Sequence, residues 1–315
     1  MLPLQSPALL QPDATREIRD KVEVIDICNV CRSKNVSILD ASSNICRCSR
    51  CGFVFDNPRP SAEDLVAFYS KPSKYDSWLA EAEARDQLWK GRVRRLLGTR
   101  KAGSLLDVGT GIGQFLAHAR PYYKEVFGTE ISNSAIELAA EKYGLSLYRG
   151  SLESIDFEGR SFDNLTLFHV LEHVSDPAAL IRKCYSLLSN RGVLVVAVPN
   201  DLNSLRARVK RVLCRLGWKH VHQVGTFGLP RLTLDGSLDE IHLSHFTPAV
   251  LKRLLQECGF EIIETGLDRY YVATGYARAK QSLWYAGCSI AHSLFRVNLY
   301  DTTLVIARKR SETPG

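Results

Sequence analysis

The chain has 315 residues, of which 45% are hydrophobic and 24% are charged, a balance that is ordinary for a globular protein. Its formal net charge of +7 favours anionic partners without naming one. No run approaches the ~20 apolar residues that span a bilayer, and the start of the chain lacks the basic region and apolar core of a signal peptide. We therefore expect a cytoplasmic protein. Residues 1–22 mix prolines, glutamines and charges without a lasting period, and are expected to form a disordered tail.

The next segment, residues 23–60, contains two cysteine pairs. Each pair has the spacing CxxC, and sixteen residues separate the two. This pattern is typical of a zinc ribbon, in which the two pairs hold one structural Zn²⁺. A fifth thiol, Cys46, would spoil the two-residue spacing as a ligand, so it is left out. The predicted metal ligands are Cys28, Cys31, Cys48 and Cys51.

A closed four-cysteine site has no open coordination position, so its expected role is structural or for docking. The alternative is a cluster of buried free cysteines. Because so short a segment has a very small apolar core, the metal is the better explanation. Binding of nucleic acid by the ribbon stays open.

Two helices are expected after the ribbon. Ser61 and Asp64 form a start like that of a capping box, before a short helix that carries Leu65, Phe68 and Tyr69. A longer helix is expected over residues 74–97, beside the sheet and covering the cofactor.

The most informative motif lies at residues 105–115. A buried strand pattern ends at Asp107 and Val108, glycines follow at every second position, and a helix pattern begins directly afterwards. Glycine allows a nucleotide to approach the backbone closely, and such turns often need a positive φ. Asp107 would repel a pyrophosphate but attract a ligand with an ammonium and a sulfonium group. An acid at the end of the next strand, Glu130, can accept hydrogen bonds from ribose hydroxyls. The glycines of the turn are Gly109, Gly111 and Gly113.

Strand and helix patterns then alternate to the end of the chain, which predicts an α/β fold with a doubly wound, mainly parallel sheet. The expected strands lie at 105–108, 126–127, 145–148, 162–168, 193–198, 260–265 and 302–307, and the expected helices at 115–119, 135–143, 177–188 and 248–255.

Two stretches interrupt this alternation. An insertion at about 201–242 begins with a basic amphipathic helix, residues 205–218, that suits an anionic membrane or a phosphate-bearing substrate. A surface helix on the rim of the active site is the alternative. The second stretch, residues 283–295, is expected to close the substrate pocket, to pack on a second subunit in a homodimer, or to touch lipid.

From about residue 100 to the end, the glycine motif and its downstream acid resemble those of class I S-adenosylmethionine-dependent methyltransferases. Residues 28–70 resemble the zinc ribbon of bacterial members that methylate sugars and glycans. The resemblance implies a seven-stranded Rossmann-like sheet with an antiparallel last strand, a methyltransferase domain over residues 61–315, and S-adenosyl-L-methionine as cofactor. It also implies that Ser151 meets the adenine and that the segment from His169 lies beside the transferable methyl group.

The segment after the fourth strand contains the predicted catalytic residues. His173 is our first choice as general base, because an imidazole with a pKa of about 6.5 accepts a proton at neutral pH. Glu172 would orient His173 or hold the loop, and a purely structural His173 is the alternative. His169, Glu172 and His173 also match the HxxEH pattern of a zinc peptidase, which requires a helix. Because His169 directly follows a strand pattern, we reject that interpretation and expect no catalytic metal.

Residues 239–247 resemble a segment of sugar methyltransferases that carry the same ribbon. The C-methylating members have a run of Tyr, His, Glu and His there, of which this chain keeps only His242. The predicted reaction is therefore O-methylation of a sugar, glycan or other small-molecule hydroxyl, with His242 and His245 on the acceptor side. Methylation of a nucleic acid such as RNA, and a non-catalytic binding module, are the alternatives. A peripheral contact with an anionic membrane, at its inner face, is also left open.

Overall fold

The computed structural model describes residues 22–71, 75–99, 103–217, 224–234, 238, 240–270 and 272–310. The expected tail lies outside the described residues except for Val22. Lys74 and Trp218, at the ends of two expected helices, also lie outside them.

The centre of the molecule is a seven-stranded sheet with the order β12-β13-β10-β9-β6-β7-β8. The five strands from β10 to β8 pair in parallel, whereas β13 is antiparallel to both β10 and β12. The predicted Rossmann-like sheet and its antiparallel last strand are thus confirmed. The strands are β6 (Ser104–Val108), β7 (Glu125–Glu130), β8 (Tyr148–Arg149), β9 (Phe162–Phe168), β10 (Leu188–Pro199), β12 (Phe260–Gly266) and β13 (Thr302–Lys309).

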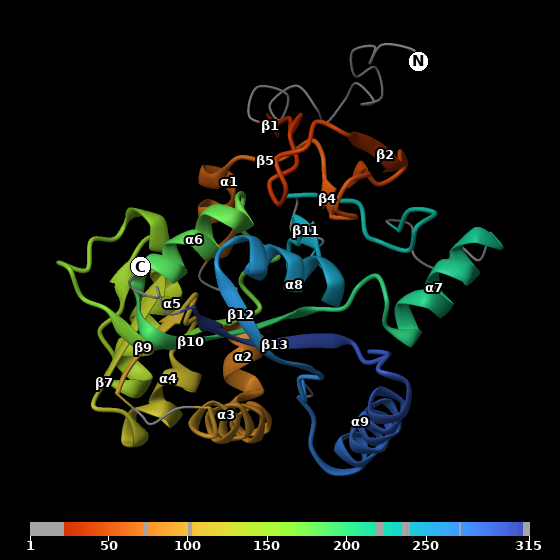
Figure 1. The fold of residues 1–315 in the computed structure, drawn as a ribbon. Coiled ribbons are helices and arrows are strands. Elements are labelled where there is room, and N and C mark those ends of the chain that lie inside the picture. The colour runs from red at the N-terminus through yellow and green to blue at the C-terminus, as the bar shows by residue number, and fades with distance from the viewer. Residues whose placement is uncertain are drawn as a thin grey trace.

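Helices cover both faces of this sheet (Figure 1). Alternate strand residues divide between two cores, because successive side chains of a strand point to opposite faces. Leu106 and Val196 share one core with α6 and α8, and Leu105 and Val195 share the other with α3 and α4. The helices are α3 (Ala82–Leu97), α4 (Gln114–Ala119), α5 (Asn133–Tyr143), α6 (Pro177–Leu187) and α8 (Pro248–Glu257).

The long helix expected over residues 74–97 is in fact two helices. A short α2 (Asp76–Ala80) precedes α3, and Glu81 between them leaves the helical conformation, with φ −96° and ψ 8°. The break lets α2 turn onto the glycine motif, which one straight helix would pass by. The preceding helix, α1 (Ala62–Tyr69), begins as predicted, with Ser61 accepting a hydrogen bond from the Asp64 amide at 3.2 Å.

The N-terminal module forms a four-stranded sheet with the order β11-β4-β3-β2. Three strands come from the ribbon: β2 (Val36–Asp40), β3 (Ile45–Cys48) and β4 (Val54–Asp56). The fourth, β11 (Ser244–His245), lies much later in the chain and pairs antiparallel with β4. A small ladder between β1 (Val22–Glu23) and β5 (Arg59–Pro60) completes the module.

Two further helices project from one side of the molecule (Figure 1). One is α7 (Leu205–Arg215), in the expected insertion, and the other is α9 (Gly275–Phe295), between β12 and β13. The first residue of α7 contacts the segment between α9 and β13, where the Leu205 amide donates to the Leu299 carbonyl at 2.9 Å. In the part of the chain that the structure describes, no helix is long and apolar enough to cross a membrane.

Candidate active site

The glycine turn between β6 and α4 has the geometry that its sequence predicts. Gly109, Gly111 and Gly113 all have a positive φ, at 66°, 57° and 85°. A Cβ on Gly109 would lie 2.6 Å from a methyl carbon of Val170, so the loop after β9 packs directly on the turn. A Cβ on Gly111 would lie 3.1 Å from the ring of Trp78. Val170 and Trp78 therefore pack closely on the glycine turn and leave little room for a side chain at Gly109 or Gly111.

The two predicted acids lie at the ends of β6 and β7 and are both buried. Glu130 accepts hydrogen bonds from the Gly111 amide at 2.7 Å and the Ser132 amide at 2.9 Å, so it closes the glycine turn onto β7. Asp107 accepts a hydrogen bond from the Thr166 hydroxyl at 2.5 Å. Burial raises the pKa of Asp107 to about 7, and burial also raises the pKa of Glu130. Each carboxylate would be stabilised by a cationic or hydroxyl-bearing ligand.

An aromatic and a cationic residue from α2 and α3, which precede the glycine turn in the sequence, lie over it. The guanidinium of Arg85 stacks 4.4 Å from the ring centroid of Trp78 and pairs with Glu81 at 2.9 Å. The Nε atom of Arg85 is buried and has no hydrogen-bond partner among the described residues. This donor is buried, cationic and without a hydrogen-bond partner, and it lies beside the glycine turn. It is suited to bind a carboxylate, such as that of an amino-acid group in a ligand.

The loop after β9 brings His169 and Glu172 together. His169 has a positive φ of 61°, which is costly for a non-glycine residue and is often found at functional sites. Its Nδ1 atom lies 3.2 Å from Oε1 of Glu172, and its ring contacts that of Tyr270 at a tilt of 51°, with centroids 4.6 Å apart. Since His169 follows β9 directly, no helix joins it to His173, and the rejected peptidase pattern lacks its helix.

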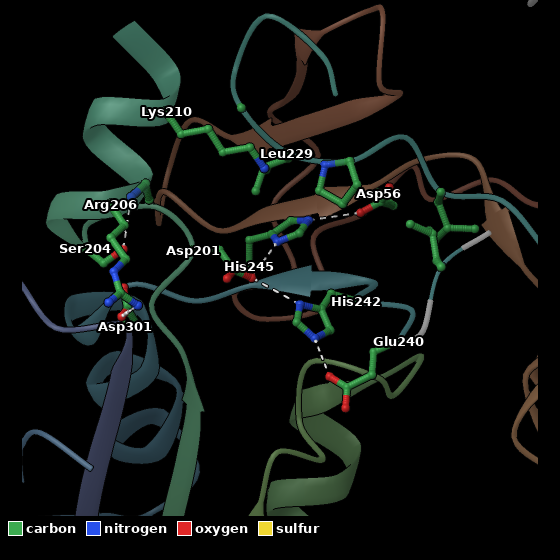
Figure 2. A pocket seen from close by; sticks show the side chains of 15 residues that line it. Asp56, Asp201, Ser204, Arg206, Lys210, Leu229, Glu240, His242, His245 and Asp301 are labelled. Carbon is green, nitrogen blue, oxygen red and sulfur yellow. Dashed lines mark hydrogen bonds and ion pairs between the residues drawn. The ribbon is translucent and has the colours of Figure 1, made fainter. Parts of the chain in front are cut away.

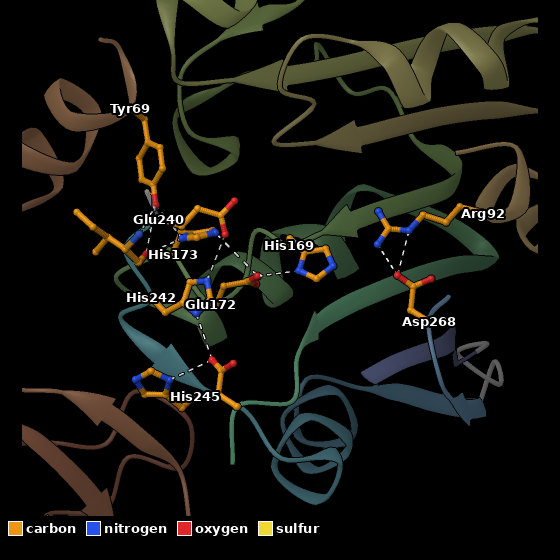
Figure 3. Close-up of polar contacts among 11 residues, drawn as sticks. Tyr69, Arg92, His169, Glu172, His173, Glu240, His242, His245 and Asp268 are labelled. Carbon is orange, nitrogen blue, oxygen red and sulfur yellow. Dashed lines mark hydrogen bonds and ion pairs between the residues drawn. The ribbon is translucent and has the colours of Figure 1, made fainter. Parts of the chain in front are cut away.

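His173 is held in one orientation by α1 and by the segment before β11. Its Nδ1 atom lies 2.6 Å from the Ile241 carbonyl oxygen, so Nδ1 carries the hydrogen and donates it. The Tyr69 hydroxyl lies 2.9 Å from the same nitrogen. Burial lowers the pKa of His173, so the ring is neutral at pH 7 with an unprotonated Nε2. That nitrogen faces Glu172 at 3.9 Å (Figure 3).

His242 and His245 share the carboxylate of Asp201, at 3.1 and 3.4 Å (Figure 2). Nε2 of His242 lies 3.6 Å from Glu240, and Nε2 of His245 lies 3.1 Å from Asp56 in β4. Burial opposes protonation of both rings, but the hydrogen bonds to carboxylates outweigh it. They raise the pKa of His242 well above its ordinary value and that of His245 to about 9.

We call these residues together the histidine cluster. It combines one neutral imidazole, two protonated imidazoles and the carboxylates that hold them. His173 and His242 are in ring contact, with centroids 5.1 Å apart. The members are Asp56, Glu172, His173, Asp201, Glu240, His242 and His245.

A cavity of about 370 Å³ opens onto this cluster (Figure 2). Glu240, His242 and His245 line its cluster side, and Arg206 and Lys210 of α7 line it opposite. Its volume is adequate for a small molecule of sugar size. The expected insertion therefore forms one wall of a cavity that ends at the predicted acceptor-side histidines.

The four predicted metal ligands also converge. Cys28 lies 3.6 Å from Cys51, and Cys31 lies 3.6 Å from Cys48, measured between sulfur atoms. Tetrahedral zinc with Zn–S bonds of about 2.3 Å needs sulfur atoms about 3.8 Å apart, so the four thiols fit one Zn²⁺. Cys46 is buried but stands outside this group.

The fold thus brings the predicted catalytic residues into one cluster and places Asp107, Glu130 and the glycines around one turn. Ser151 is exposed and bonds only locally, its hydroxyl donating to Ser154 at 3.3 Å. Sequence reasoning missed Tyr69 and Arg85 as site residues. Tyr69 was taken for part of an apolar helix face, and only its hydroxyl, an uncommon feature of such a face, hinted at a polar role.

The α/β fold thus combines a glycine turn between β6 and α4 with a separate cavity that is lined in part by histidines. A family model described as a methyltransferase domain matches residues 82–265, which is more than half of the chain. The chain belongs to this methyltransferase family, and its cofactor is S-adenosylmethionine.

Individual proteins agree with this assignment. A probable S-adenosylmethionine-dependent methyltransferase of Mycolicibacterium smegmatis is 24% identical over 67% of this chain and 70% of its own length. A demethylmenaquinone methyltransferase of Staphylococcus aureus is 29% identical over 35% of this chain, which is about half (48%) of that relative. Magnesium protoporphyrin IX methyltransferase of Synechocystis, solved with bound SAH, shares the fold. It has a TM-score of 0.51 at 15% identity, over 79% of this chain and 100% of its own.

Proposed function

We propose that the chain methylates a hydroxyl group of a sugar, a glycan or another small molecule. The observation that carries this proposal is the cavity of about 370 Å³, which Glu240, His242 and His245 of the histidine cluster line. A hydroxyl acceptor needs a base close by. The neutral imidazole of His173 lies next to the cavity, in contact with the lining residue His242, with ring centroids 5.1 Å apart.

The cofactor supplies a methyl group on a cationic sulfur. On this proposal Asp107 holds its ammonium group, Glu130 accepts from the ribose hydroxyls and Ser151 meets the adenine. The glycine turn gives the backbone close access, and His169 borders the reacting end. Trp78 and Arg85 exclude water from the same side, and exclusion of water strengthens each charge contact.

His173 acts as the general base. Bound S-adenosylmethionine would supply the methyl group to the acceptor oxygen and would keep the electron pair of the broken carbon–sulfur bond on its sulfur. Nε2 of His173 would take the hydroxyl proton. Nδ1 keeps its hydrogen bond to the Ile241 carbonyl throughout, which fixes the ring. Glu172 stabilises the imidazolium that forms, since its carboxylate faces the same nitrogen at 3.9 Å. His242 is kept protonated by Asp201 and Glu240, and Nδ1 donates to Asp201. Nε2, which has no hydrogen-bond partner among the described residues, donates to an oxygen of the acceptor.

The test is a methylation screen with nucleotide sugars, lipid-linked glycans and RNA as acceptors, read by mass spectrometry. We expect a mass gain of one methyl group on a hydroxyl compound. His173→Ala should lower kcat by about 100-fold or more, with a smaller change in KM. His118→Ala is the matched control, because His118 contacts Asp86 on α3 and not the cluster.

Transfer to RNA alone, with binding that falls steeply as salt is added, would replace this proposal by nucleic-acid methylation. Tight cofactor binding without turnover on any acceptor would favour a non-catalytic module. Unchanged kcat in His173→Ala would remove His173 as the base.

A further inference from the structure

Helix α7 has an exposed apolar stripe that the described fold leaves uncovered. Four apolar side chains recur at helical spacing, and none of the eleven residues of the helix is buried. Their exposed fractions rise from 40% to 76% towards the C-terminal end. A solvent-facing helix normally shows polar residues there. The stripe consists of Leu205, Val209, Val212 and Leu216.

Helix α9 has a similar stripe along 21 residues, of which only Cys288 is buried. Neither helix is needed to route the sheet. The antiparallel neighbours β12 and β13 require only a short turn, yet the whole of α9 lies between them. The exposed apolar residues of α9 are Tyr276, Leu283, Ile290, Leu294 and Phe295.

The charges on the two helices all have one sign. Neither helix contains an aspartate or a glutamate, while α7 has five basic residues and α9 has two. Arg206 of α7 stacks over Trp284 of α9 at 5.2 Å, so the two helices meet at the N-terminal end of α7. The two helices thus combine exposed apolar residues with a net positive charge, and this combination complements a surface that is both apolar and anionic. RNA would explain the charge but not the exposed leucines and valines.

We propose that α7 and α9 dock this protein on an anionic lipid bilayer. Such docking does not depend on the acceptor or on the catalytic residues. It would place the cavity beside the lipid surface, since Arg206 and Lys210 of α7 both line that cavity.

The test is co-sedimentation of the full-length protein with phosphatidylcholine vesicles, and with vesicles in which phosphatidylglycerol replaces part of that lipid. We expect binding mainly to the phosphatidylglycerol vesicles, weakened by added salt. Val209→Glu combined with Val212→Glu should lower partitioning at least about tenfold, and Arg208→Ala should lower it about fivefold, which corresponds to about 1 kcal/mol per basic residue. Ile38→Glu combined with Ile263→Glu is the matched control. Both residues are exposed and apolar, and both lie in strands, outside α7 and α9.

Four results would overturn the proposal. One is the absence of binding to the anionic vesicles. Another is equal loss of binding in the control variant. The third is a dimer, detected by light scattering, that the α7 substitutions convert to monomer, because a second copy would then cover the stripe. Binding of RNA that is unaffected by Val209→Glu and competes with vesicles would reassign the basic residues to nucleic acid and also reject the proposal.

Discussion

Replacement of Asp107 by asparagine removes the charge proposed to hold the cofactor ammonium, while the amide oxygen can still accept from Thr166. A hydrogen bond to a charged partner contributes about 2 kcal/mol, so the Kd for S-adenosylmethionine should rise roughly 30-fold when the carboxylate is ionised. The measurement is calorimetry with S-adenosylmethionine and its demethylated product.

The pH dependence makes this prediction sharper. Because burial raises the pKa of Asp107 to about 7, protonation competes with the ligand below that pH. The Kd of the wild-type protein should therefore fall about fivefold between pH 6 and pH 7, and the asparagine variant should lack this part of the slope. Asparagine removes a buried charge, so the variant should be at least as stable at pH 7, and thermal unfolding checks that. The same pH slope in both proteins would refute the role of Asp107.

Further predictions concern stability, the glycine turn and zinc. The carboxylates around His245 raise its pKa from 6.5 to about 9, so protonated His245 stabilises the fold fully below pH 6.5, and this stabilisation is lost as the pH rises through 9. Urea unfolding should therefore show that the free energy of unfolding falls by on the order of 3 kcal/mol over this pH range. His245→Asn should lack this fall. Gly109→Ala should cost more than the roughly 1–2 kcal/mol of left-handed strain and should weaken cofactor binding, because its Cβ meets Val170. Gly144→Ala, which has open space around it, should show the strain alone. Cys28→Ser should abolish the bound zinc seen by atomic emission, whereas Cys46→Ser should retain it; zinc loss in both would reject the ligand assignment.

Local sequence patterns predicted those parts of the site whose residues lie close together in the sequence. The glycine turn, Asp107 and the cysteine pairs are each contained in one short segment whose spacing sets its geometry. The approach of Tyr69 to His173 could not be predicted, because 104 residues separate them and only the packing of α1 brings them together. The break at Glu81 was missed for a related reason. Its surroundings favour helix, and it is the covering of the glycine turn by Trp78 that requires α2 to change direction.

The sheet that contains both β4 and β11 connects the predicted zinc site to the histidine cluster. Val54 pairs with His245 along the backbone, and Asp56, next but one in the same strand, holds the imidazole of His245. A chelator that removes the zinc, or an oxidant that reaches the cysteine sulfurs, is therefore expected to loosen β4, the strand that holds His245. The glycine turn adjoins the seven-stranded sheet instead. On the proposed function, a protein that has lost its zinc would therefore still bind S-adenosylmethionine but would bind the acceptor more weakly.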